Sequence, residues 1–301
     1  MSTVTAQAPA KINLWLSVGP LGADGFHPLA TVFQSLTLYD LVHATTTSPG
    51  SGITLTVEGA DGVPVDRTNL AWSAASLVAD ELGIAADVSL HLVKRIPVAG
   101  GMAGGSADAA ATLVACDALW RGQVGRQRLM EIAATLGSDV PFMLHGGTAI
   151  GTGRGDRLTP VLTAGTFHWV LAAADRGLST PAVYGQLDRL RADHPPASEY
   201  LSDDVMSALR AGDALALGSA LGNDLQQPAL SLMPSLGQLL TAGVDAGALG
   251  AMVSGSGPTC VFLARDRDHA LDIAARLSGA GLCRTVACAA GPTAGAQIID
   301  G

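Results

Sequence analysis

A glycine-rich segment carries the clearest chemical signal in this sequence. Four of the six residues from Gly100 to Gly105 are glycines, and they lie between an expected strand and an expected helix. Glycines let the backbone approach a ligand closely and turn its N–H groups inward, and the first turn of a helix adds unpaired donors and a favourable dipole. The segment therefore predicts a phosphate site. A flexible connector or a tight contact between helix and strand is the alternative.

Spacing excludes two familiar phosphate loops. A Walker A loop needs Lys and then Ser or Thr after its last glycine, whereas Gly105 is followed by Ser106 and Ala107. A dinucleotide fingerprint would fall on Ala99, Gly101 and Gly104, and no acidic residue ends a strand about 20 residues later. The loop therefore belongs to another class.

Hydrophobic periodicity predicts the elements that position this loop in the first half of the chain. Alternation of apolar and polar residues is typical of strands, and these are expected at 12–18, within 29–46, and at 53–57 and 88–92. Apolar residues at helical spacing predict helices at 69–82, 108–120 and 129–136. A hairpin of 147–152 and 158–162 ends this unit.

The second half of the chain repeats neither the order of strands and helices of the first half nor its glycine-rich loop. Strands are expected at 169–174, 251–254, 259–264 and 284–289. Helices are expected after Thr180 and at 205–221, 235–246 and 268–277. This order predicts a split βαβ sandwich and a domain boundary near residue 160, giving domains 1–160 and 161–301.

Composition limits the core and the partners. The 301 residues are 48% hydrophobic but only 4% aromatic, so the core must be built from small aliphatic side chains. With 17 basic and 26 acidic residues and no basic cluster, the net charge of −9 argues against nucleic-acid binding. No apolar stretch approaches the roughly 20 residues that span a bilayer, and the four cysteines lack zinc or disulfide spacing. We expect a cytoplasmic protein without a membrane partner.

Three ordered motifs then resemble one kinase superfamily. They are the segments Ala8 to Leu14, Pro97 to Ala110 and Met252 to Thr259. Their order and separation are similar to those of the GHMP kinases, named after galactokinase, homoserine kinase, mevalonate kinase and phosphomevalonate kinase. Two further segments, 23–27 and 136–141, resemble the branch of that superfamily whose substrate is a sugar alcohol carrying cytidine diphosphate.

This resemblance implies a fold and a reaction. The fold would be α+β, with an N-terminal ribosomal-protein-S5-like βα domain and a C-terminal ferredoxin-like split βαβ domain. The reaction would transfer the γ-phosphoryl group of ATP, with Mg²⁺ expected, to the 2-hydroxyl group of the cytidine-linked substrate, within the methylerythritol phosphate route to isoprenoid precursors. The protein would be a monomer or a weak homodimer.

The resemblance assigns the catalytic roles to Lys11 and Asp139. Asp139 would accept the hydroxyl proton, and Lys11 would orient Asp139 and stabilise charge on the reacting oxygens. Without the resemblance, helix capping by Ser138 and Asp139 and an exposed lysine at a strand start are the simpler interpretations. Independently of the family, Asn13 lies on the same pleat face as Lys11 and should reach the same cleft.

The remaining site residues are also implied by the resemblance. The ATP-binding set is Asn69, Lys94, Pro97, Val98, Ala99, Gly100, Gly101, Met102, Ala103, Gly104, Gly105, Ser106 and Ala107. Of these, Lys94 and Asn69 are the residues expected near the adenine. The substrate-binding set is Asn13, Phe26, His27, Thr180, Pro181 and Tyr184, with the rings of Phe26 and Tyr184 on opposite sides of the base. The third motif contributes Gly255, Ser256 and Gly257. Core packing of the two rings, a helix N-cap at Asn69 and a solvated strand end at Lys94 are the simpler alternatives.

Departures from the family pattern leave the metal ligands open. Ala103 stands where a glycine is usual, Ala107 where a second serine is common, and Pro258 where a small residue is usual. Ser106 is a candidate Mg²⁺ ligand, whereas Asp108 is expected to complement the helix N-terminus.

Two other functions remain open from the sequence. One keeps the fold and changes the acceptor to another small alcohol, such as mevalonate or homoserine. The other is a nucleotide-binding protein without catalysis, which the presence of both Lys11 and Asp139 disfavours.

Overall fold

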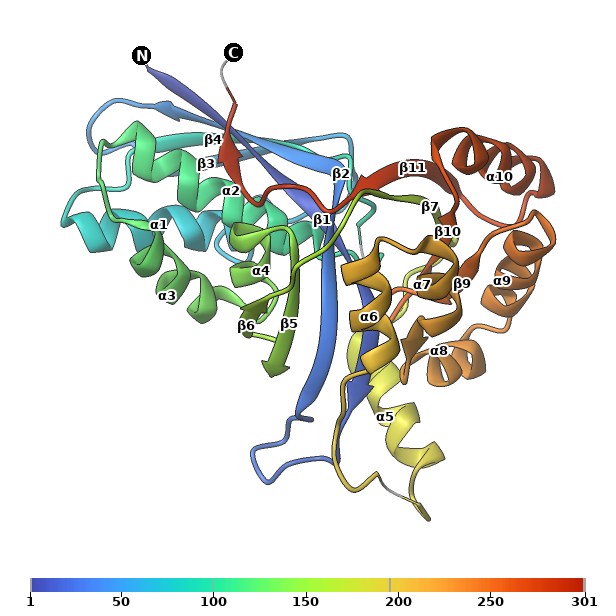
Figure 1. Cartoon of the computed structure of the whole chain (residues 1–301). Coiled ribbons are helices and arrows are strands. Elements are labelled where there is room, and N and C mark those ends of the chain that lie inside the picture. Colours follow the sequence, from blue (N-terminus) through green and yellow to red (C-terminus); the bar gives the residue numbers. More distant parts are fainter. Residues whose placement is uncertain (1, 99, 195, 300–301) are drawn as a thin grey trace.

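The structure of the chain, a computed structural model, describes residues 2–98, 100–194 and 196–299. An eight-stranded sheet forms the scaffold of the first half (Figure 1), and its main path runs in the order β12-β1-β2-β4-β3. Strands β5 and β8 join this path by pairing with β2 and β1 respectively, and β6 pairs with β5. Its strands are β1 (Thr3–Val18), β2 (Leu29–Thr46), β3 (Ile53–Glu58), β4 (Val88–Val93), β5 (Thr148–Gly153), β6 (Arg157–Pro160), β8 (Gly222–Asn223) and β12 (Gln297–Ile298).

Four helices accompany this sheet: α1 (Leu70–Leu82), α2 (Gly104–Leu119), α3 (Arg126–Leu136) and α4 (Val140–His145). Helix α2 packs on β1 and β2 with alanines that are fully buried, among them Ala107, Ala110 and Ala111. Small side chains let the helix lie close to the sheet, so the predicted small-aliphatic core is confirmed. Asn69 caps α1 by accepting a hydrogen bond from the amide of Ala71, and the left-handed Gly83 (φ 65°) ends that helix as expected.

The second half is built on a four-stranded antiparallel sheet in the order β11-β7-β10-β9. The strands are β7 (Phe167–Ala173), β9 (Gly250–Val253), β10 (Thr259–Ala264) and β11 (Thr285–Gly291). The helices are α5 (Thr180–Leu190), α6 (Asp203–Ala211), α7 (Ala214–Ala220), α8 (Gln226–Leu232), α9 (Ser235–Asp245) and α10 (Arg267–Ala280). The succession β7, α5, β9, β10, α10, β11 confirms the expected element order.

Three local expectations needed correction. Strand β1 begins at Thr3 instead of after Pro9, because its pairing with β2 shifts register between Pro9 and Ala10, and such an irregularity accommodates a proline. The single helix expected at 205–221 is two helices, since Gly212 adopts a left-handed φ of 68° and Asp213 caps α7. Helix α2 begins at Gly104, four residues before the expected start.

The two halves share strands and core. Strands β8 and β12 come from the second half of the sequence, yet both pair with β1. A buried hydrogen bond of 2.9 Å also joins the two sheets, from Trp169 Nε1 on β7 to Gln34 Oε1 on β2. The domain boundary near residue 160 therefore stays a prediction. The N-terminal sheet also includes β8 and β12, which lie after that position in the sequence. No helix within the described ranges has the length and apolarity needed to cross a bilayer.

Gln34→Met should lower the free energy of unfolding by about 1–3 kcal/mol, because the buried Trp169 N–H loses its acceptor while the side-chain volume is kept. Urea unfolding measures this loss. Gln238→Met, at an exposed position of α9, is the matched control and should change stability little. Equal stability of the two variants would contradict the role of this bond.

Candidate active site

Lys11 and Asn13 lie side by side on β1, as the alternation of the strand predicted. Lys11 Nζ donates a hydrogen bond to Asn13 Oδ1 at 2.9 Å, and the two residues are only 6% and 3% exposed. Asn13 Nδ2 in turn donates to Thr31 Oγ1 at 2.8 Å, and this hydroxyl donates to the carbonyl of Trp15. The chain of hydrogen bonds fixes the direction of the Lys11 side chain.

Asp139 faces this lysine from the start of α4. Its Oδ2 atom lies 3.7 Å from Lys11 Nζ, and its side chain is 33% exposed. Asp139 occupies the N-cap position of α4, yet its carboxylate makes no capping hydrogen bond. The capping interpretation is therefore wrong for this side chain, and the carboxylate faces the lysine while it stays partly exposed to solvent.

The glycine loop and the third motif pack against each other beside Lys11. Gly101 has a left-handed φ of 73°, and a Cβ atom there would lie 2.5 Å from the carbonyl oxygen of Ser254. A Cβ atom on Gly255 would lie 3.3 Å from Asn13 Oδ1 and 3.8 Å from Lys11 Nζ. Three motifs that are far apart in the sequence thus meet at one place.

Two polar side chains from the second half hold the third motif in position. Asn223 donates to the carbonyls of Val253 and Gly255 at 2.8 and 2.7 Å. The hydroxyl groups of Thr180 and Ser256 lie 2.9 Å apart. Sequence reasoning missed Asn223, although an Asn-Asp pair before a helix is itself a signal for a polar turn.

Ala103 precedes α2 in a left-handed conformation, with φ 59° and ψ 36°. The family's usual glycine adopts this region without strain, whereas a residue with a Cβ atom loses about 1–2 kcal/mol. Ala103 in place of the usual glycine therefore adds backbone strain at this position, and α2 still begins at Gly104. Ala99, also in the predicted ATP-binding set, lies outside the described residues.

Lys94 is buried under the start of α2. Its Nζ atom donates to the carboxylate of Asp40, to Asp108 Oδ2 at 2.5 Å and to the carbonyl of Gly104 at 3.2 Å. The other oxygen of Asp40 accepts from the amides of Arg95 and Ile96 at 2.6 and 2.8 Å. This network joins β2, the end of β4 and the first turns of α2.

Lys94 and Asn69, the two side chains expected near the adenine, are already hydrogen-bonded within the protein. All three Lys94 donors make hydrogen bonds. Asn69 donates from Nδ2 to the carbonyl of Pro64 and accepts at Oδ1 from the amide of Ala71. Burial raises the pKa of Asp108 to about 7; Lys94 opposes this rise, and the Asp40 carboxylate adds to it. Their contact with adenine stays a prediction. The sequence analysis did not identify Asp40 as part of the site. The signal that could have identified it is a single carboxylate within a largely apolar strand.

The residues predicted to hold the base come from the β1–β2 loop and from α5, two segments that lie close together (Figure 1). His27 packs on Tyr184, with ring centroids 5.2 Å apart and planes at 36°. Burial raises the pKa of the Tyr184 hydroxyl to about 12, and the Asp139 carboxylate adds to this rise. Phe26 is half exposed, and the Arg154 guanidinium covers its ring at 3.7 Å. A base held between Phe26 and Tyr184 stays a prediction.

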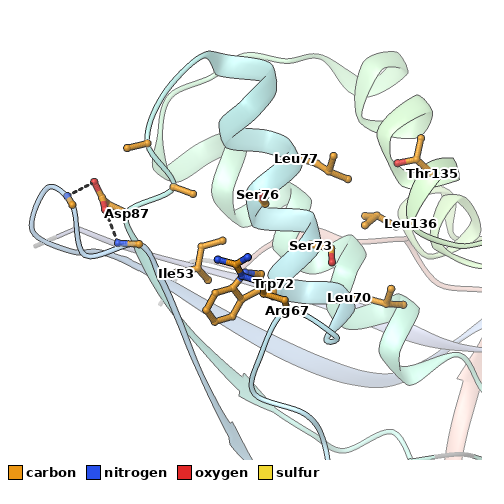
Figure 2. A pocket seen from close by; sticks show the side chains of 14 residues that line it. Ile53, Arg67, Leu70, Trp72, Ser73, Ser76, Leu77, Asp87, Thr135 and Leu136 are labelled. Carbon is orange, nitrogen blue, oxygen red and sulfur yellow. Dashed lines mark hydrogen bonds between the residues drawn. The ribbon is translucent and has the colours of Figure 1, made fainter.

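A separate hollow of about 910 Å³ lies along α1 (Figure 2). Trp72, Ile53 and Asp87 line one end, and Thr135 and Leu136 line the other. The Asp87 carboxylate accepts two backbone hydrogen bonds from the 50–52 loop, at 2.8 and 2.7 Å. Of the described residues that line this hollow, none belongs to the predicted catalytic or binding sets.

Two family models match the chain. The GHMP kinases N terminal domain matches residues 69–147, and the GHMP kinases C terminal model matches residues 205–282. The first match covers the glycine loop and Asp139, and the second covers the third motif.

Relatives and solved structures extend the match to nearly the whole chain. The 4-diphosphocytidyl-2-C-methyl-D-erythritol kinase of Rhodococcus jostii is 56% identical over 99% of this chain and 95% of its own length. The protein of that name from Mycobacterium tuberculosis is 54% identical over 99% of this chain and 93% of its own. A crystal structure of 4-(cytidine 5'-diphospho)-2C-methyl-D-erythritol kinase has a TM-score of 0.79 at 34% identity, covering 95% of this chain and 98% of its own.

Asp139→Asn should reduce turnover about 10²-fold or more, because an amide cannot accept the hydroxyl proton. The fold should stay intact, since this carboxylate caps no helix. Steady-state turnover and circular dichroism measure the two effects, and Asp268→Asn on the exposed first turn of α10 is the matched control. Near-normal turnover of the Asp139 variant would exclude this carboxylate as the essential base.

Lys94→Met should lower the free energy of unfolding by about 3–5 kcal/mol, because Asp40 and Asp108 would remain buried without their counter-ion. Arg95→Met removes the same charge from an exposed neighbouring side chain and should be nearly neutral. Denaturant unfolding distinguishes the two. A Lys94 variant of normal stability with a raised KM for ATP would instead favour a direct contact with adenine.

Proposed function

This chain belongs to the GHMP kinases, and within them to the 4-diphosphocytidyl-2-C-methyl-D-erythritol kinases, and from that membership we propose how its cleft performs the reaction. It is a phosphotransferase with an alcohol acceptor, ATP is its phosphoryl donor, and its product belongs to the methylerythritol phosphate route to isoprenoid precursors. The observation that carries the proposal is the approach of Lys11 Nζ to Asp139 Oδ2, at 3.7 Å, beside the glycine loop.

The glycine loop and the start of α2 bind the phosphates of ATP. Residues 100–105 turn backbone N–H groups toward the ligand, and the sixteen-residue helix α2 places the positive end of its dipole at the same point. This arrangement explains how a chain with a net charge of −9 binds a polyanion, because backbone donors add no net charge.

Asp139 accepts the proton of the substrate's 2-hydroxyl group as that oxygen attacks the γ-phosphorus atom of ATP. The neighbouring Lys11 ammonium orients the Asp139 carboxylate before the attack and stabilises negative charge on the reacting oxygens during it. Asn13 and Thr31 contribute by keeping the ammonium group in one direction. The alternative of a binding protein without catalysis does not explain why the two groups face each other in the cleft.

Mg²⁺ would be held mainly by the phosphates of ATP, because this ion keeps several waters and needs few protein ligands. In the part of the chain that the structure describes, no cluster of three or more carboxylate, histidine or cysteine ligands is found. Ser106, half-buried in the first turn of α2, would be the protein ligand of Mg²⁺, whereas Asp108 is paired with Lys94. When bound, the ion neutralises charge on the transferring phosphates.

The cytidine group of the substrate would bind next to His27 and Tyr184, with Phe26 at the outer side of the pocket. Support comes from the packing of His27 on Tyr184 and from the influence of Asp139 on the Tyr184 hydroxyl. A substrate with both a base and a reacting hydroxyl requires the base pocket and the catalytic carboxylate to be neighbours, and α5, which carries Tyr184, also contacts the third motif through Thr180 and Ser256. Mevalonate and homoserine contain no base to fill this pocket.

We place the enzyme in the cytoplasm, where ATP is available, as a monomer or a weak homodimer.

A coupled ADP-release assay tests this proposal with 4-diphosphocytidyl-2-C-methyl-D-erythritol, mevalonate and homoserine as acceptors. We expect turnover with the first substrate and at most background rates with the other two, in reactions that contain ATP and Mg²⁺. Omission of Mg²⁺ should abolish turnover. Turnover restricted to mevalonate or homoserine would overturn the substrate assignment while leaving the kinase chemistry intact.

A further inference from the structure

A histidine and an aspartate from opposite halves of the sequence meet at the edge of the base pocket. His27 Nε2 lies 2.8 Å from Asp188 Oδ1. His27 belongs to the β1–β2 loop and Asp188 to α5, two segments that lie close together (Figure 1). The His27 side chain is 7% exposed, whereas Asp188 is 44% exposed. Asp188 is absent from the sequence-based site, because only the docking of α5 on the loop brings it to His27.

The contact decides which nitrogen of His27 carries the proton. An ionised carboxylate can only accept hydrogen bonds, so Nε2 must be the protonated, donating nitrogen. In a neutral imidazole the other nitrogen, Nδ1, is then an acceptor. Asp188 thereby selects one of the two tautomers that a free histidine would populate.

The acceptor nitrogen remains available for a ligand. Within the described part of the chain, no residue makes a hydrogen bond to His27 Nδ1, and this atom is not sealed from solvent. The flat face of the imidazole packs on Tyr184, which prevents the ring from turning freely. Ring position and tautomer are thus both set before a base arrives.

An acceptor at this place distinguishes two pyrimidines of almost identical shape. Cytosine presents an amino group on C4, which donates, whereas uracil presents a carbonyl oxygen there, which can only accept. A site that pairs with the donor leaves two acceptors facing each other when the carbonyl analogue binds. The cost of that mismatch favours the amino base.

From these observations we infer that Asp188 is a specificity-determining positioning residue, which acts through His27 to select a cytidine-linked over a uridine-linked substrate. The inference rests on the proposed function, since it takes His27 as the residue that meets the edge of the base. Asp188 itself touches neither the base nor the reacting hydroxyl. Its role is to hold the proton on Nε2.

Asp188→Asn tests this role, because an amide can either donate or accept and no longer selects one tautomer. We expect the ratio of kcat/KM for the cytidine-linked substrate to that for its uridine-linked analogue to fall about tenfold or more. The kcat with the cytidine substrate and the KM for ATP should stay within about twofold of their original values. Asp188→Glu keeps the carboxylate and should restore discrimination.

Asp193→Asn removes the same charge from an exposed position just beyond α5 and should leave the ratio unchanged. Nitrogen NMR of the imidazole ring gives a readout that needs no substrate. The original chain should show His27 protonated on Nε2, and Asp188→Asn should show a mixture of tautomers. If Asp188→Asn is poorly folded, Asp188→Ser, which also lacks the carboxylate, takes its place in both measurements.

The outcomes separate the inference from the proposed function. An unchanged substrate ratio in Asp188→Asn, or an original chain with His27 protonated on Nδ1, would overturn the inference while leaving the kinase assignment in place. An original chain that phosphorylates no cytidine-linked substrate would overturn the proposed function and with it the specificity role. A fall in the ratio together with mixed ring signals would support both.

Discussion

The site depends on keeping the ammonium group of Lys11 buried and pointed in one direction. A buried charge is costly unless it is paired and hydrogen-bonded, and here Asn13 accepts one hydrogen bond while the Asp139 carboxylate lies within ionic contact. Asn13 is held by Thr31 on the neighbouring strand, so the position of the lysine follows from the pairing of β1 with β2. Because Asp139 makes no capping bond of its own, the lysine is its main protein partner and its free face is left for a substrate hydroxyl.

The two lysines of the chain have different functions because their carboxylate partners differ in burial. Lys94 lies between Asp40 and Asp108, both buried, and also binds the carbonyl of Gly104, so it joins the start of α2 to the sheet. Lys11 meets a partly exposed carboxylate at the edge of the cleft. The first arrangement joins the start of α2, next to the glycine loop, to the sheet, and the second belongs to the proposed catalytic pair. Neither requires a basic surface, since the loop supplies backbone donors.

The second half of the chain completes a cleft that the first half cannot form alone. The third motif packs on the glycine loop and on Asn13, and Asn223 holds its carbonyls. Helix α5 brings Tyr184 and Asp188 to the β1–β2 loop, where His27 contacts both. Strands β8 and β12 return to β1, so the lysine strand is supported by residues from both halves. This interleaving brings the residues that we propose for catalysis, phosphate binding and base recognition into one small region.

The sequence by itself determined the elements with strong periodicity and the residues within one element that share a face. Lys11 and Asn13 were placed together by the alternation of β1, the glycine loop by its composition, and α1 with its Gly83 end by local helix signals. Only the tertiary structure decided that Lys94 forms ion pairs with two buried carboxylates, that the Asp139 side chain makes no capping hydrogen bond, and that His27 contacts Asp188. The short elements β8, α8 and β12 were also missed. The physical reason is common to all of these: periodicity and capping act over a few neighbouring residues, whereas the partner of a buried polar group is chosen by packing between segments far apart in the chain.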